Sequence, residues 1–125
     1  MKISRIVVLF LLAGMIGVSG CKRENKELKK EAKTISEVMC RTIGLMNELK
    51  KANPADSARI SKLQLDYQNV QSEMNVLYEA FRAKHEGRDT SAAFNDEFRK
   101  YLNESMLECK NLSKEDRETF EKAVK

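Results

Sequence analysis

Two stretches of the chain carry apolar residues at alternating intervals of four and three positions, the spacing of a seam along one face of an α-helix. The first stretch spans residues 28–49 and is interrupted at Thr42, whereas the second, over residues 60–81, is unbroken. The seam residues are Leu28, Ala32, Ile35, Met39, Met46 and Leu49 in the first, and Ile60, Leu63, Tyr67, Val70, Met74, Leu77 and Phe81 in the second. The pattern therefore predicts two helices, each with one apolar face.

The two predicted helices pack against each other if the chain reverses near its only proline. Asn53 is a preferred N-cap residue, Pro54 suits the first position of a helix, and Asp56 lies close behind. Matching the seams outwards from this point pairs Leu28 with Phe81 at the other end and leaves only a short turn. The sequence therefore predicts an antiparallel helical hairpin.

The apolar surface of this hairpin is wider than one seam, so further helices are expected. The flanking apolar residues are Val38, Ile43, Leu45, Leu65 and Tyr78. A lone hairpin would leave them in water, and a third helix should cover them. We therefore expect an all-α fold in which the hairpin is extended to a three- or four-helix bundle.

Capping residues locate these further helices. Gly87 is a plausible end for the second helix, and Asp89, Thr90 or Ser91 can cap a third. The apolar residues of the third helix are Phe94, Phe98, Tyr101, Leu102, Met106 and Cys109. Ser113 opens a capping-box-like segment before a short fourth helix that carries Phe120 and Val124.

The first twenty residues have the organisation of a secretory signal. Lys2 and Arg5 precede an apolar run over residues 6–18, and small residues follow it. This run contains Gly14 and Gly17 and is shorter than the about 20 apolar residues that a membrane-spanning helix needs. We therefore expect the segment to direct export.

The signal ends in the tetrapeptide Val18-Ser19-Gly20-Cys21. An aliphatic residue, two small residues and a cysteine resemble the lipobox of bacterial lipoproteins. The resemblance covers residues 1–21 alone, and it implies cleavage before Cys21, a diacylglycerol on the cysteine sulfur and often a third chain such as palmitate on the new amino terminus. Several acyl chains make a durable tether, because each buried methylene contributes about 0.8 kcal/mol. The alternatives are an uncleaved anchor, or an ordinary signal in which the cysteine is incidental.

On this interpretation the chain has three parts: a lipoprotein signal peptide at 1–20, a lipidated polar tether at 21–27 and a helical bundle domain at 28–125. Lys22 stands where many lipoproteins kept in the inner membrane have aspartate. By resemblance, this favours the outer membrane, on its periplasmic or surface face, if the cell has one.

The charge balance gives little indication of a nucleic-acid partner. The whole chain has 23 basic and 19 acidic residues. Loss of Lys2 and Arg5 with the signal leaves 21 basic residues against 19 acidic ones, a net charge of +2. Such a small excess on an exported chain predicts no binding to nucleic acid.

Cys40 and Cys109 remain once Cys21 is set aside, and they either form a disulfide or stay as buried free thiols. In an up-down-up bundle the first and third helices are parallel. Cys40 then lies about 24 Å along the first and Cys109 about 28 Å along the third, at about 1.5 Å per residue. The similar heights and the oxidising environment of exported proteins favour the disulfide.

The sequence predicts no catalytic residues. His85 is the only histidine, and it falls near the predicted end of the second helix between Lys84 and Glu86, which favours a solvated or helix-capping role. The acidic pairs Asp96-Glu97 and Glu115-Asp116 occupy adjacent helical positions and so diverge from each other. We expect the protein not to be an enzyme.

Cofactor sites are not evident either. Haem attachment needs Cys-x-x-Cys-His and bundle metal sites use Glu-x-x-His, and neither motif occurs. Methionine is a soft copper ligand, and the candidates are Met39, Met46, Met74 and Met106. The first three lie in the predicted seams, where methionine commonly fills core space. We expect no metal and no cofactor other than the covalent lipid.

The resulting hypothesis is a membrane-tethered envelope lipoprotein that acts as a non-catalytic structural or protein-interaction module. Its expected partners are the membrane, through the acyl anchor, and an envelope protein, with no small-molecule substrate evident. The alternatives are a small inhibitor or immunity-type binder of an envelope-targeted enzyme and, less favoured, a metal-binding helical bundle.

Overall fold

The structure is a computed structural model that describes residues 25–88 and 90–125. This part of the chain contains four helices and no strand: α2 (Lys26–Lys51), α3 (Ser57–Lys84), α4 (Ala92–Met106) and α5 (Lys114–Val124). The predicted all-α fold and helical bundle are confirmed. The signal, the lipobox residues 18–20 and Cys21 lie outside the described residues.

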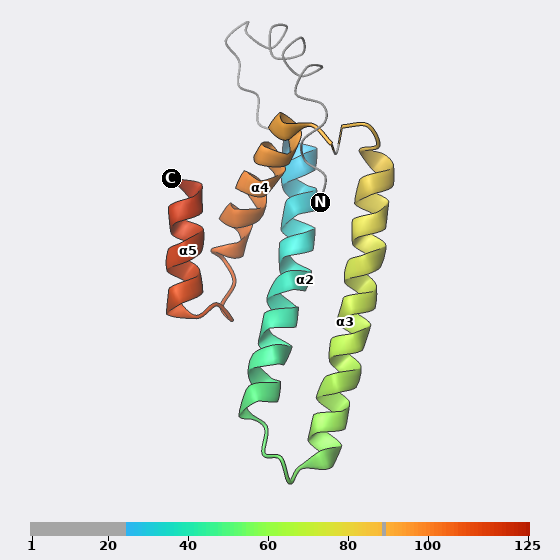
Figure 1. Cartoon of the computed structure of the whole chain (residues 1–125), viewed down its shortest axis with the longest axis vertical. Coiled ribbons are helices and arrows are strands. Elements are labelled where there is room, and N and C mark those ends of the chain that lie inside the picture. The colour runs from blue at the N-terminus through green and yellow to red at the C-terminus, as the bar shows by residue number, and fades with distance from the viewer. Residues whose placement is uncertain (1–24, 89) are drawn as a thin grey trace, which may run out of the picture.

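Helices α2 and α3 form the predicted antiparallel hairpin (Figure 1). The 26 residues of α2 give it a length of about 39 Å. Asp56, not Asn53, is the N-cap of α3, and its carboxylate accepts a hydrogen bond from the Arg59 amide at 3.1 Å. Pro54 lies in the turn, where the Asn53 side chain accepts from the Ala55 amide at 3.0 Å. The second helix thus begins later than the proline suggested.

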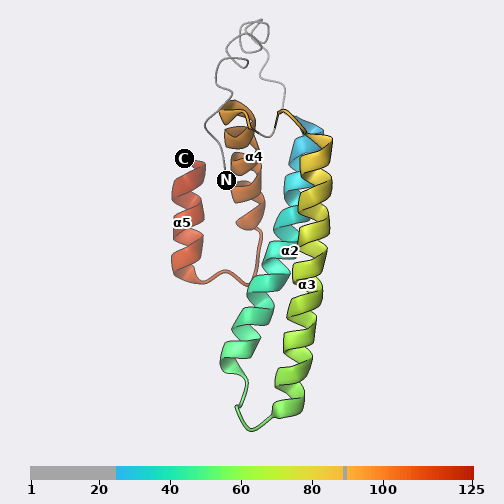
Figure 2. The same ribbon diagram turned by 45° about the vertical axis from the view of Figure 1, so that its right-hand side comes forward.

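Helix α4 packs along one half of α2, and α5 packs against α4 (Figures 1 and 2). Ser91, one of the three candidate caps, caps α4, and Ser113 caps α5 as predicted, through hydrogen bonds from the amides of Phe94 and Asp116. Between α3 and α4, Gly87 takes the left-handed conformation, with φ +82°. We call the end of the domain where α2 and α4 begin and α3 ends the tether end, and the turn 52–56 the far end.

The hydrophobic core lies in the half of the molecule nearest the tether end. Its buried residues are Leu28, Ala32, Ile35, Phe81, Phe94 and Tyr101. In the far half Leu63 and Val70 are buried, but Met46 in the seam is 41% exposed. The prediction that a third helix covers Leu65 and Tyr78 is wrong, because α4 lies against α2 and leaves these two residues of α3 57% and 36% exposed.

Cys40 and Cys109 form a disulfide, with their Cα atoms 5.7 Å apart. Helix α4 ends at Met106, so Cys109 lies in the connection 107–113 and not in the third helix as predicted. Arg117 of α5 donates hydrogen bonds to the carbonyls of Leu107 at 2.7 Å and Cys109 at 2.9 Å. The disulfide and the Arg117 guanidinium together attach the connection to both α2 and α5.

His85 is the C-cap residue of α3, but it is buried, with 5% of its surface exposed. Its Nε2 lies 2.7 Å from Oε2 of Glu31 on α2, and its ring lies 4.7 Å from that of Phe81 and 5.0 Å from that of Phe94. Of the two predicted roles, the helix-capping position is therefore confirmed and the exposure to solvent is wrong. The starts of α2 and α4 flank the end of α3 and exclude water from the imidazole.

Glu31 also accepts a hydrogen bond from Lys84 at 2.7 Å. Burial raises the pKa of the Glu31 carboxyl, but the hydrogen bonds from Lys84 and His85 outweigh burial, so the pKa lies below its ordinary value of 4.5. The native state therefore favours the ionised carboxylate. The stability this contributes is present above the unfolded-state pKa and is lost as the pH falls through the lower folded-state pKa.

We predict that reduction of the disulfide lowers the melting temperature by roughly 15 °C or more. The bond joins residues 69 apart, and closing such a loop in the unfolded chain contributes about 4 kcal/mol. Thermal unfolding followed by circular dichroism, with and without a reductant, measures the difference. The double variant Cys40→Ala/Cys109→Ala is the control, since the reductant should not change its melting temperature. Equal melting temperatures for the oxidised and reduced protein would contradict the prediction.

We also predict that Glu31→Gln destabilises the domain by about 1 kcal/mol at pH 7 and by much less near pH 3. The stability that the lowered folded-state pKa of Glu31 gives to the wild type is lost as the pH falls below 4.5, so the difference between the two proteins should shrink. Urea unfolding at both pH values gives the two differences. Glu27→Gln is the matched control, because Glu27 is exposed and pairs only with Lys84 among the described residues. An equal loss from both variants, or a loss that does not depend on pH, would refute the role of Glu31.

Candidate interaction surface

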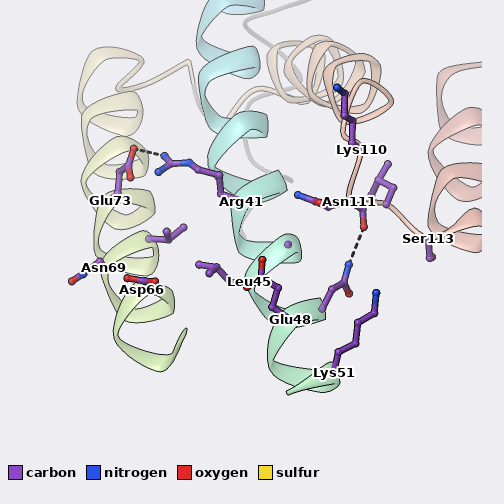
Figure 3. Close-up of a pocket in the computed structure, with 14 residues that line it drawn as sticks. Arg41, Leu45, Glu48, Lys51, Asp66, Asn69, Glu73, Lys110, Asn111 and Ser113 are labelled. Carbon is purple, nitrogen blue, oxygen red and sulfur yellow. Dashed lines mark hydrogen bonds and ion pairs between the residues drawn. The ribbon is translucent and has the colours of Figure 1, made fainter. Parts of the chain in front are cut away.

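A cleft of about 900 Å³ lies between α2, α3 and the connection after Cys109 (Figure 3). Its lining residues are Arg41, Gly44, Leu45, Asn47, Glu48 and Lys51 of α2, Asp66, Asn69, Val70 and Glu73 of α3, and Lys110, Asn111, Leu112 and Ser113. We call it the distal cleft. It occupies the middle and far part of α2, beyond the region that α4 covers.

Charged groups of both signs surround the distal cleft. Arg41 of α2 and Glu73 of α3 form an ion pair across its upper edge, at 2.6 Å (Figure 3). Both side chains are about half exposed, so this pair contributes little to stability. Lys51, Lys110, Glu48 and Asp66 also border the cleft, around the apolar Leu45, Val70 and Leu112. The lining of the distal cleft therefore combines a few apolar residues with charged groups of both signs.

Asn111 attaches the connection to α2. Its side-chain amide donates to the backbone carbonyl of Cys40 at 3.0 Å. Its backbone carbonyl accepts a hydrogen bond from the Asn47 side chain at 3.0 Å. The close approach depends on Gly44, because a Cβ atom there would lie 2.7 Å from Nδ2 of Asn111. Sequence reasoning missed this contact. The signal for it was Gly44 itself, a glycine within an otherwise helical segment.

A second groove, of about 670 Å³, lies between α2 and α3 at the tether end. Its lining residues are Lys26, Glu27, Lys30, Glu31, Thr34 and Ile35 of α2, and Leu77, Ala80, Phe81 and Lys84 of α3. We call it the tether-end groove. Its lining is less polar than that of the distal cleft, and its charged residues belong to the first turns of α2 and the last turn of α3.

The methionines considered as copper ligands differ in burial. Met39 and Met74 pack against the core and Met106 is fully buried, whereas Met46 is 41% exposed. Within residues 25–88 and 90–125, no three histidine, cysteine, aspartate or glutamate side chains gather in a way that could hold a metal ion. Over the same residues, no helix combines the length and the apolar character needed to span a membrane.

Comparison with known proteins identifies no relative: no family model, no curated protein and no solved structure matches this chain.

We predict that Gly44 and Asn111 are energetically coupled. In an Asn111→Ala background, Gly44→Ala should stabilise the domain by about 1 kcal/mol, the helix-propensity difference between the two residues. In the wild type the gain should be much smaller, because the new methyl group displaces Asn111 from the Cys40 carbonyl. A double-mutant cycle by urea unfolding measures the coupling. An equal gain in both backgrounds would show that the connection does not depend on Gly44.

Proposed function

We propose that this chain is a lipoprotein of a bacterial envelope, held at the membrane through Cys21, whose helical domain is a non-catalytic module that binds an envelope protein. The observation that carries the proposal is the tetrapeptide Val18-Ser19-Gly20-Cys21 at the end of an export signal. Lys22 after the cysteine favours the outer membrane if the cell has one.

The start of the domain supports a short tether. The backbone amide of Asn25 donates to the hydroxyl of buried Tyr101 at 3.1 Å, which fixes the point where the chain enters the bundle. Cys21 lies four residues earlier, and four extended residues span at most about 14 Å. An acylated Cys21 would therefore hold the tether end of the domain close to the lipid surface.

The position of the distal cleft supports a protein partner. Gly44 lies 18 residues beyond Lys26 on α2, so the cleft is centred about 27 Å from the tether end. It therefore remains accessible while the tether end faces the membrane. Leu45 and Leu112 line the cleft and are only partly buried. A partner that covers such apolar surface gains about 25 cal/mol per Å² removed from water.

Photo-cross-linking in living cells tests whether the distal cleft contacts an envelope protein. A photoreactive amino acid at Asn69, which lines the distal cleft, should give one adduct with a protein of the envelope, identified by mass spectrometry. The matched control is Asn75, an exposed asparagine of α3 outside the cleft, where that adduct should be absent. The same adducts at both positions, or none at Asn69, would contradict the proposed surface. An adduct with a foreign hydrolase or toxin would instead identify an inhibitor.

Metabolic labelling with a fatty acid tests the anchor separately. We predict that the wild type incorporates the label and loses residues 1–20, whereas Cys21→Ser incorporates none and keeps its leader. Label retained by Cys21→Ser would contradict lipidation at this residue.

A further inference from the structure

The tether-end groove has the size of a small-molecule site. Its volume of about 670 Å³ falls within the range of about 300–1,000 Å³ that is usual for ligand pockets. The first three turns of α2 and the last two turns of α3 form its walls. An ion pair of 2.7 Å between Glu31 and Lys84 joins the two walls.

Polarity changes along the groove. Lys26 and Lys30 line the part nearest the tether end, whereas Ile35 and Leu77 line the part farther from it. From Lys26 to Ile35, α2 rises about 13 Å. A ligand that matches this arrangement has a charged group at one end and an apolar chain of comparable length, which is the form of a lipid.

The charge at the mouth favours an anion. The carboxylates of Glu27 and Glu31 are both engaged by Lys84, and Glu31 also contacts His85. Lys26 and Lys30 form no ion pair with another described residue. They are four positions apart on one face of α2, about 6 Å between Cβ atoms, so both ammonium groups can reach one phosphate.

We infer that the tether-end groove binds an anionic phospholipid of the membrane, with its phosphate between Lys26 and Lys30 and one acyl chain over Leu77 and Ala80. The location of the site at the membrane surface rests on the proposed tether through Cys21. A membrane phospholipid fits better than the chain's own acyl groups, because the diacylglycerol on a lipobox cysteine carries no anion to match the two lysines.

Photolabelling of the chain, purified from membranes in neutral detergent after removal of its signal, tests this site. The probe is phosphatidylglycerol with a photoreactive acyl chain, and phosphatidylcholine with the same chain is its control. We expect phosphatidylglycerol to label the peptides that contain Ile35, Leu77 and Ala80 at least ten times more strongly than phosphatidylcholine does. Equal labelling by the two lipids would overturn the assignment of the lysines to a phosphate.

Two variants separate the groove from general attraction to a basic surface. Lys26→Gln/Lys30→Gln should lower the labelling about tenfold, whereas the matched pair Lys29→Gln/Lys33→Gln, also four positions apart on α2 but outside the groove, should leave it unchanged. Ala80→Phe fills the groove without a change of charge, at an exposed position, and should also abolish labelling. Equal losses from the two lysine pairs, or full labelling of Ala80→Phe, would overturn the proposal.

The Cys21→Ser chain distinguishes a membrane phospholipid in the groove from the chain's own acyl group. It also separates a failure of the proposed tether from a failure of the proposed lipid site. If the lipidated chain is not labelled but Cys21→Ser is, the groove holds the chain's own acyl group and the membrane phospholipid is excluded. If the wild type carries no lipid on Cys21 but its groove is still labelled, the proposed lipid anchor is refuted and the proposed phospholipid site is retained. A groove that cross-links to a partner protein in place of the lipid would also refute the inference.

Discussion

The disulfide between Cys40 and Cys109 determines which half of the hairpin is covered. It joins the middle of α2 to the connection just beyond α4, so that α4 and α5 are held against the half of α2 nearest the tether end. Helix α4 has 15 residues and is about 22 Å long, much shorter than the 39 Å of α2. The core therefore lies in one half of the molecule, and the far half remains a two-helix hairpin.

This division has a functional consequence. The half nearest the tether end is fixed by buried contacts, including His85 with Glu31 and the Asn25 amide with Tyr101. The far half has two helices, an incompletely buried seam and the distal cleft on its side. A chain tethered at Cys21 would thus hold the half with the buried core near the lipid. It would present the half with the incompletely buried seam to the aqueous phase. The two proposed sites follow this division.

Much of the fold could be predicted because it depends on local rules. The period of the seams gives α2 and α3, and the capping serines Ser91 and Ser113 locate the starts of α4 and α5. The start of α3 was placed wrongly because Asn53 and Asp56 are both good N-caps within one turn, and nothing local selects between them.

The remaining features depend on contacts between distant residues. His85 has charged neighbours in the sequence, but its burial comes from Glu31, 54 positions away, and from Phe94 on α4. The exposure of Leu65 could not be predicted either, because it depends on which helix of the hairpin α4 packs against. The same holds for the distal cleft, whose third wall is the connection around Asn111. The spacing of residues along the chain did not indicate these particular contacts.

We propose a mature chain that begins at an acylated Cys21 and carries the Cys40–Cys109 disulfide. Intact-mass spectrometry of the protein extracted from cell membranes without a reductant tests both parts together. We expect the mass of residues 21–125 plus a diacylglyceryl group, with or without a further acyl chain, less two hydrogens for the disulfide. A mass that corresponds to the whole chain from Met1, with no lipid and with both thiols reduced, would contradict it.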